Sequence, residues 1–299
     1  MSKLCNLGLK QTPINIKTSK ITLSSKNIKI RYFSMNKIVI EKAKNNILID
    51  YDNGSHIEYN RNIYELNKIA FTHRSSHKIN GKSYPLEMNL YHSNINNSRD
   101  VLIIGIFLKP TSKKKNKSTR FFDKIKKFPK NFGQTVETKT RDWNLTHVIG
   151  NIHKFGFFKY NGSLPRKPCT ENVKWIILET PSLCSDNFYV NMKTIIGRNA
   201  PPEKKLNGRK IYYNKNNNQR KTKTTNNTRC PPEHPNCTIQ STKKKKRHIK
   251  KKKNKFYPSP EHRHHYYFTV LKFIIGFTII GTCLLFIYRS FTNKYFQMV

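Results

Sequence analysis

The stretch KYNGSLPRKPCTENVKWIILETP, from Lys159 to Pro181, carries the most information about the fold. Its second half contains Val173 to Leu178, a short run rich in β-branched residues that predicts a strand. Similar strand candidates precede it at Ile28 to Ile30, Ile38 to Ile40, Ile47 to Tyr51 and Val101 to Leu108. The last of them, VLIIGIFL, is almost wholly apolar, which predicts a strand covered on both faces. The segment FFDKIKKF, from Phe121 to Phe128, has apolar residues at helical spacing and predicts one short helix.

The opening stretch resembles the pattern Y-x-G-S-L-T-T-P-P-C-x-E-x-V-x-W-[IV]-[LIV] of the α-carbonic anhydrases. Four other segments resemble the same family in the right order, namely TPINI (Thr12 to Ile16), LEMNLYHSN (Leu86 to Asn94), VLIIGIFLKP (Val101 to Pro110) and GRNAPPEKKLNGRKI (Gly197 to Ile211). Together they cover residues 11 to 213. The resemblance implies an α+β, mostly β fold: one domain around a large twisted mixed β-sheet with short helices on its surface.

The residues at the metal site depart from that family. Catalytic zinc needs three neutral imidazoles and an open fourth position, where the metal lowers the pKa of bound water to about 7. The resemblance implies an H-x-H pair on one strand and a third histidine in LEMNLYHSN, where Asn89 stands instead. The pair is expected at Phe71 and His73 of IAFTHR. At most one ligand survives, so we expect no metal cofactor and no carbonic anhydrase activity, with His73 and His77 as ordinary strand or loop histidines.

Other positions around the same site are partly kept. Glu87 and His92 match the family's carboxylate and later histidine, whereas Ser76 replaces the carboxylate of its S-E-H motif. Pro165 stands where a hydroxyl is expected and offers neither hydroxyl nor backbone N–H. Arg166 and Lys167 follow it at what would be the mouth of the site. The resemblance thus implies that a lost cation site has gained fixed positive charge.

The charge is far larger than solubility requires. The chain has 58 Lys and Arg against 16 Asp and Glu, a formal net charge of +42. Residues 214–299 hold 19 of the basic and 2 of the acidic residues, which leaves +25 on residues 1–213. This excess predicts a polyanionic partner, with nucleic acid, anionic lipid and sulfated polysaccharide all open. Codon bias of an AT-rich genome is the alternative source of the lysines and asparagines.

Membrane-anchored poxvirus homologues of this family attach virions to chondroitin sulfate on host cells, and the chain resembles them. The resemblance implies a virion adhesion protein that binds sulfated glycosaminoglycan, chondroitin sulfate first. The candidate contacts are the basic residues Lys113, Lys114, Lys115, Lys117, Arg120, Lys124, Lys126, Lys127, Lys130, Arg166 and Lys167. The alternative is a membrane-tethered basic protein that binds nucleic acid. No recognised RNA or DNA module supports specific nucleic-acid binding.

The end of the chain differs in character. Residues 214–265 are rich in Asn, Thr, Lys, His and Pro and nearly free of large aliphatics, which predicts a basic disordered stalk after the domain of residues 1–213. Phe268 to Tyr288 is a run of 21 residues with Lys272 as its only charge. At about 1.5 Å per residue it reaches about 30 Å, so we expect a transmembrane helix over 266–288 and a short tail over 289–299. A buried core helix is the alternative.

Charge beside the predicted span sets the expected orientation. Ten of the thirteen residues from Lys243 to Lys255 are basic, namely Lys243, Lys244, Lys245, Lys246, Arg247, Lys250, Lys251, Lys252, Lys253 and Lys255. The span is therefore expected to leave the N-terminal part in the cytosol and, in a virion membrane assembled there, on the particle surface. The run itself favours anionic lipid headgroups.

The six cysteines are widely spaced without a CxxC, so the sequence predicts neither a disulfide framework nor a structural metal. A stalk cysteine, Cys230 or Cys237, remains a candidate for linking two chains in a homo-oligomer.

Overall fold

The structure is a computed structural model, and it describes residues 4–24, 28–51, 54–113, 115–150 and 156–215. The helical elements are α1 (Leu4–Leu7), the 3₁₀ helix η1 (Thr18–Lys20), α2 (Lys117–Asp123), α3 (Thr146–Ile149) and α4 (Asp186–Ile196). The strands are β1 (Asn15–Ile16), β2 (Ile21–Ser24), β3 (Lys29–Arg31), β4 (Met35–Ala43), β5 (Asn46–Asp50), β6 (His56–Tyr59), β7 (Asn62–His73), β8 (Lys78–Ile79), β9 (Leu86–Asn94), β10 (Asn97–Thr111), β11 (Thr135–Trp143), β12 (Phe157–Ser163), β13 (Glu171–Leu178), β14 (Ser182–Ser185) and β15 (Ile211–Asn214).

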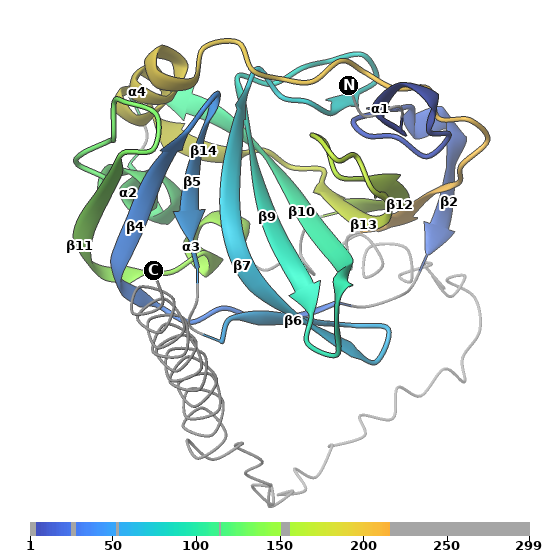
Figure 1. Cartoon of the computed structure of the whole chain (residues 1–299), viewed down its shortest axis with the longest axis horizontal. Helices are drawn as coiled ribbons and strands as arrows, with labels where there is room; N and C mark the ends of the chain where they lie inside the picture. Colours follow the sequence, from blue (N-terminus) through green and yellow to red (C-terminus); the bar gives the residue numbers. More distant parts are fainter. Residues whose placement is uncertain (1–3, 25–27, 52–53, 114, 151–155, 216–299) are drawn as a thin grey trace, which may run out of the picture. The chain divides into compact units, whose positions relative to one another are not determined.

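One sheet of 13 strands dominates the fold (Figure 1). Its main path runs β11-β4-β5-β7-β9-β10-β13-β12-β15-β2, with β14 on β10 and the β3–β6 pair on β7. The sheet is mixed, because β10 pairs in parallel with β13 and β14, and β15 pairs in parallel with β2. The mostly β domain around a large mixed sheet that the sequence predicts is confirmed, and each of the five strand candidates overlaps a strand, with Ile28 and Tyr51 just outside β3 and β5.

The sheet is buried on both faces at its centre, as the apolar run of β10 predicts. Leu102, Ile104 and Ile106 point into the larger core, which α2, α3 and α4 help to enclose. Ile103 and Phe107 point the other way, into a second core with Trp175 of β13. Because successive residues of a strand face opposite sides, only a nearly continuous apolar run can serve both cores.

The helices differ from the sequence prediction. Asn116 begins α2 with a capping box, in which its side chain accepts from the Thr119 N–H and the Thr119 hydroxyl accepts from the Asn116 N–H. The helix therefore starts four residues before Phe121 and ends at Asp123, so the prediction of a helix through Phe128 is wrong at both ends. The longest helix of the described residues, α4, was not predicted, although Phe188, Met192 and Ile196 bury one face at helical spacing.

Several predictions fall outside the described residues. They concern the stalk, the span from Phe268 to Tyr288, the basic run from Lys243 to Lys255, and Lys114. Within the part of the chain that the structure describes, no helix combines the length and apolar character needed to cross a membrane.

Candidate functional site

The predicted metal site lies where β7, β9 and β10 run side by side (Figure 1). Asn89 of β9 is directly opposite Ala70 of β7 on one side and Gly105 of β10 on the other. Opposed residues of an antiparallel pair share a face, and successive residues alternate between faces. The face that carries Asn89 therefore receives Ala70 and Thr72 from β7.

Phe71 and His73 lie on the opposite face of β7. Phe71 packs in the larger core against Phe188 of α4, with ring centroids 5.7 Å apart. His73 packs against Tyr189, and its Nδ1 lies 3.0 Å from the carbonyl oxygen of Gly197. The prediction that these two residues take the ligand positions is therefore wrong by one residue, a slip that moves a side chain to the other face. Ala70 and Thr72 are identified only by the register of β7 against β9, which the residues of IAFTHR alone do not set.

The Asn89 face holds few metal donors. Asn89 Oδ1 is buried and accepts no hydrogen bond from the described residues. The Thr72 hydroxyl accepts from Ser76 Oγ at 3.1 Å, and Ala70 ends in a methyl group. Catalytic zinc takes three nitrogen, sulfur or carboxylate ligands, so this set of side chains does not fit a zinc ion. Among all described residues, no group of three or more His, Cys, Asp and Glu is arranged to hold a metal.

Close packing explains why the opposing residue on β10 is glycine. A Cβ at Gly105 would lie 2.7 Å from Ile177 Cδ1, which is closer than real Cβ contacts. It would also lie 3.3 Å from both Asn89 Oδ1 and Glu87 Oε1. The amide and the carboxylate therefore lie directly over the bare backbone of β10.

A chain of buried hydrogen bonds survives beside Asn89. The carboxylate of Glu87 accepts from the His77 backbone N–H at 2.9 Å and contacts His77 Nδ1 at 2.8 Å. His77 Nε2 lies 2.7 Å from the Tyr160 hydroxyl, which lies 3.0 Å from Thr12 Oγ1. We assign the proton to Nδ1, so that the imidazole donates to Glu87 and accepts from Tyr160. Burial raises the pKa of Tyr160 and keeps the phenol neutral.

This series of hydrogen bonds connects Glu87 at the centre of the sheet to Thr12 in the N-terminal segment. The His77 ring also packs on Trp175 at a centroid distance of 4.7 Å. Both His77 and Glu87 have no exposed surface. Sequence reasoning identified Glu87 but left His77 as an ordinary loop histidine and did not weigh Tyr160, because their proximity arises only from the fold.

Tyr91 is the next residue after Asn89 on the same face. It packs against the second core, and burial raises its pKa while Arg166 works in the opposite direction. Arg166 and Lys167 are exposed in the loop between β12 and β13, which also carries Pro165. Arg166 Nη2 donates to the Asn199 carbonyl at 2.7 Å, so part of its hydrogen-bonding capacity is already used.

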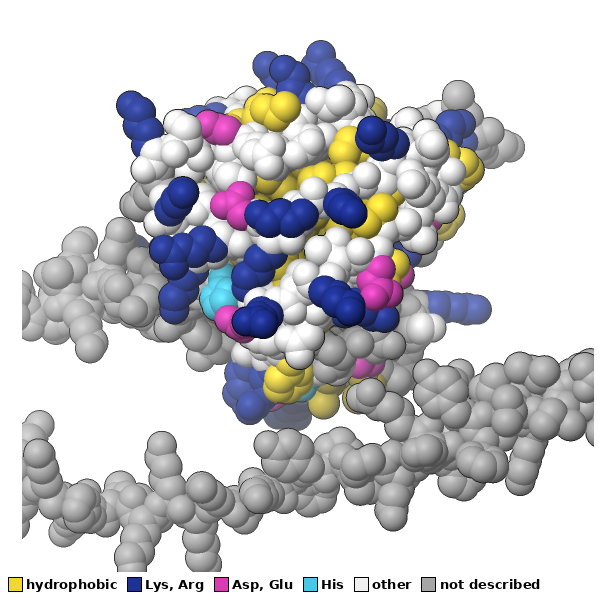
Figure 2. Space-filling view, turned by 90° about the vertical axis from the view of Figure 1, so that its left-hand side faces the viewer, with side chains coloured by type: hydrophobic (Ala, Val, Ile, Leu, Met, Phe, Trp, Pro, Cys, Tyr) yellow, Lys and Arg dark blue, Asp and Glu magenta, His cyan; other side chains and the backbone are white. Residues whose placement is uncertain are grey.

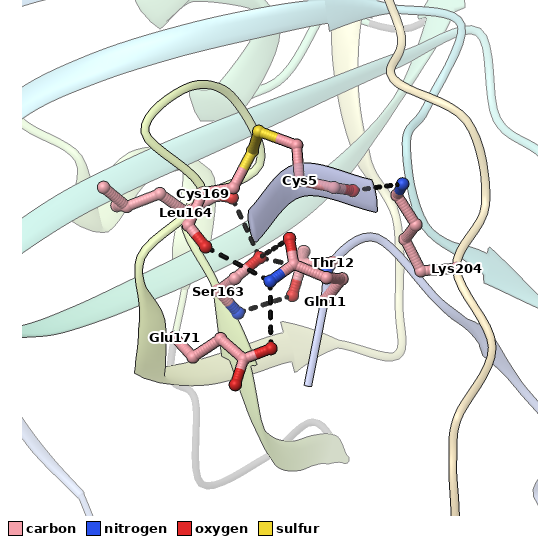
Figure 3. Close-up of a disulfide and its surroundings, with 8 residues drawn as sticks. All are labelled: Cys5, Gln11, Thr12, Ser163, Leu164, Cys169, Glu171 and Lys204. Atoms are coloured by element: carbon pink, nitrogen blue, oxygen red, sulfur yellow. Dashed lines mark hydrogen bonds between the residues drawn. A yellow bond between two sulfur atoms is a disulfide. The ribbon is translucent and has the colours of Figure 1, made fainter. Parts of the chain in front are cut away.

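A disulfide joins Cys5 to Cys169 in that same loop (Figure 3). Gln11 Nε2 donates beside it to the Cys169 carbonyl and to Glu171 Oε1, and Lys204 Nζ donates to the Cys5 carbonyl. The prediction of no disulfide is therefore wrong. The two cysteines are 164 positions apart, and only the packing of the N-terminus on the β12–β13 loop brings them together.

His92 is a structural residue on the opposite face of β9. Its Nδ1 donates to the Leu102 carbonyl at 3.1 Å, and its Nε2 accepts from the Tyr32 hydroxyl at 2.7 Å. Burial lowers the pKa of His92 to about 3, because the charged imidazolium would lose its hydration. The residue therefore stays neutral near pH 7.

Apart from Arg166 and Lys167, the predicted basic contacts that the structure describes lie on α2 or in the segments on either side of it. Most are exposed, namely Lys113, Lys115, Lys117, Arg120, Lys126, Lys127 and Lys130. Lys124 differs, since its ammonium donates to the carbonyls of Arg141 and Asp142. The face on the left of Figure 1, where β11, α2 and α4 lie, carries scattered Lys and Arg side chains and fewer acidic ones (Figure 2).

Comparison with known proteins identifies the family to which the domain is similar. The family model described as eukaryotic-type carbonic anhydrase matches residues 1–231. A carbonic anhydrase of Nostoc sp. is 28% identical over 211 residues, which cover 70% of this chain and 77% of that protein. Dioscorin DB3S of Dioscorea polystachya is 22% identical over 216 residues, which cover 70% of this chain and 78% of that protein.

Solved structures show the same fold. The α-carbonic anhydrase from Thermovibrio ammonificans, in complex with the inhibitor sulfanilamide, aligns with a TM-score of 0.63 at 22% identity. The alignment covers 71% of this chain and 90% of that one. From the match of the family model over most of its length, the chain belongs to the α-carbonic anhydrase family.

Proposed function

We propose that this chain is a non-catalytic α-carbonic anhydrase homologue that binds sulfated glycosaminoglycan, chondroitin sulfate first, and attaches a poxvirus particle to host cells. One observation carries the non-catalytic half of the proposal. Ala70, Thr72 and Asn89 share the face on which an H-x-H pair and a third histidine would bind zinc. Without imidazoles at these positions, no metal-bound hydroxide forms to attack carbon dioxide.

The surviving hydrogen bonds support loss of the metal rather than loss of the fold. Glu87, His77 and Tyr160 remain paired and buried, so the site is still well built around Asn89. Asn89 Oδ1 nevertheless has no partner among the described residues. A buried carbonyl without a partner costs stability. The unpaired Asn89 Oδ1 is therefore consistent with a fold that was kept after its metal ligand was replaced.

Surface charge supports a polyanionic ligand. The net charge of +25 on residues 1–213 belongs to the folded part, and the exposed lysines around α2 make no ion pair with the acidic residues that the structure describes. Sulfate esters stay ionised at all physiological pH values and accept charge-assisted hydrogen bonds from Lys and Arg. Each exposed contact is weak, but many along one polymer add up through avidity.

The membrane part of the proposal rests on sequence. The apolar run from Phe268 to Tyr288 would anchor the chain, and the preceding basic run would hold anionic lipid. With the domain outside the particle, Cys230 or Cys237 could link two chains in a homo-oligomer.

A salt series tests the proposal on the full chain in non-ionic detergent. Binding to immobilised chondroitin sulfate is measured against binding to heparan sulfate and to a single-stranded RNA at matched salt. The comparison variant is Lys113→Ala/Lys115→Ala/Lys117→Ala. Preference for one glycan supports adhesion, and weaker binding by the variant places contacts near α2. Equal binding to every polyanion, RNA included, overturns the proposal and leaves the nucleic-acid alternative.

A further inference from the structure

A basic groove of about 670 Å³ is lined by none of Ala70, Thr72 and Asn89 and by none of the basic contacts predicted from sequence. It opens where β12, β13 and β15 lie side by side near the β6–β7 turn. Its size falls within the range of roughly 300–1,000 Å³ that is typical of small-molecule sites. The cations that line it are Lys10, Lys159, Lys174, Arg209 and Lys210. No Asp or Glu is among the described residues that line it.

Strand register brings two of these cations together. Lys159 of β12 is opposite Ile176, and Lys174 of β13 is opposite Asn161, so all four side chains share one face. Lys159 and Lys174 are therefore diagonal neighbours, about 7–8 Å apart at their backbones. Lys159 Nζ donates to Ser24 Oγ at 3.0 Å, and Lys174 pairs with Asp100. Both ammonium groups are thus held in place at the groove, that of Lys159 nearly buried and that of Lys174 with its charge compensated by Asp100.

The rest of the charge comes from Arg209 and from two exposed lysines. Arg209 donates to the backbone carbonyls of Leu206, Asn161, Gln11 and Lys205, and its guanidinium lies over the Tyr160 ring. The carbonyl acceptors fix its position and carry no formal charge, while the carboxylate of Glu171 interacts with the guanidinium. Lys10 and Lys210 are exposed at the rim, where their ammonium groups remain free to move toward a ligand.

Neutral groups in the groove favour a sugar over a nucleic acid. Asn60 and Asn161 offer side-chain amides that can hydrogen-bond sugar hydroxyls. Tyr212 is 40% exposed and gives one ring surface for the apolar face of a sugar. Tyr59 is half-buried, and burial raises its pKa. Single-stranded nucleic acid is bound on a succession of exposed rings, and the described lining does not offer one.

We propose that this groove binds a short anionic segment of a sulfated glycan, with Lys10, Lys159, Lys174 and Lys210 facing its sulfate groups and Asn60, Asn161 and Tyr212 facing its sugar rings. The assignment rests on the proposed function and gives the glycan a built site on β12, β13 and β15. The lysines around α2 then serve as outer contacts for a longer chain.

The test uses the full chain in non-ionic detergent and a chondroitin sulfate tetrasaccharide. The groove variant is Lys10→Gln/Lys210→Gln, and the matched control is Lys44→Gln/Lys139→Gln, which removes the same charge from exposed positions outside the predicted glycan contacts. We expect the groove variant to lose affinity about tenfold and the control to change less than about threefold. Hydrogen exchange gives the location: the tetrasaccharide should slow exchange at Tyr59–Asn60 and at Arg209–Lys210.

The outcomes separate the two proposals. If the wild type binds no sulfated glycan, the proposed function fails and the groove assignment fails with it. If the wild type binds but the control loses more affinity than the groove variant, only the groove assignment is overturned. Equal protection of the same amides by unsulfated chondroitin or by an oligouridylate also overturns it, in the second case in favour of nucleic acid.

Discussion

Asn89 lies directly opposite Ala70 across the β7–β9 ladder, on the face that Thr72 and Glu87 share. Under the proposed function, this relationship marks the face on which the family's metal site would lie, and Ala70, Thr72 and Asn89 are on that face. The carboxylate of Glu87 and the imidazole of His77 are hydrogen-bonded to each other. The side chains of Ala70, Thr72 and Asn89 offer a methyl, a hydroxyl and an amide.

Replacing those three side chains should restore a metal site. In Ala70→His/Thr72→His/Asn89→His, three imidazoles converge on one face, and we expect about one zinc per chain by elemental analysis. The control is Phe71→His/Asn89→His, which recreates an H-x-H pair with His73 on the wrong face. It should bind no zinc. A folded triple variant without zinc, or a control that binds it, would contradict the assigned register.

The disulfide should contribute substantially to stability. Cys5→Ser/Cys169→Ser removes a link across 164 positions of sequence, and we expect the free energy of unfolding to fall by about 2–5 kcal/mol. Urea unfolding with and without dithiothreitol measures this difference. The reductant should destabilise the wild type and leave the variant unchanged. Equal stability of both proteins under oxidising conditions would contradict the prediction.

The sequence predicts features set by neighbouring residues better than features set by contacts between residues far apart in the chain. Local alternation and apolar runs locate β4, β5, β10 and β13, because a strand's own residues encode its burial. The position of Phe71 depends on pairing with β9, and IAFTHR alone does not set that register. The Cys5–Cys169 bond and the His77–Tyr160 contact join distant segments, so they become visible only once the sheet has formed.

Stability should fall as the pH is lowered, because His92 is held neutral. Its pKa is about 3 in the folded chain and about 6.5 when unfolded, so the unfolded state binds the extra proton between these values. The contribution is complete above pH 6.5 and is lost as the pH falls toward 3, at up to about 1.4 kcal/mol per pH unit. Unfolding free energies of wild type and His92→Gln, measured from pH 7 to 4, test this. Parallel pH profiles would refute it.

We expect Glu87 to stabilise the fold through its hydrogen bonds to His77. Glu87→Ala leaves two buried donors of His77 without an acceptor, its backbone N–H and Nδ1–H. We expect a loss of roughly 2–5 kcal/mol in unfolding free energy, and a smaller loss in Glu87→Gln, whose amide oxygen still accepts one bond. Ser76→Ala, which removes one hydroxyl, is the control and should cost less. A neutral Glu87→Ala would show that the hydrogen-bonded chain does not stabilise the fold.

The most direct test of the central claim is carbon dioxide hydration by the full wild-type chain, assayed with saturating zinc in detergent beside the histidine-restored variant. We predict that the wild type hydrates carbon dioxide no faster than buffer with the same zinc, because Ala70, Thr72 and Asn89 do not hold the metal. Zinc-dependent hydration by the wild type that a chelator abolishes would contradict the account and identify the protein as an enzyme.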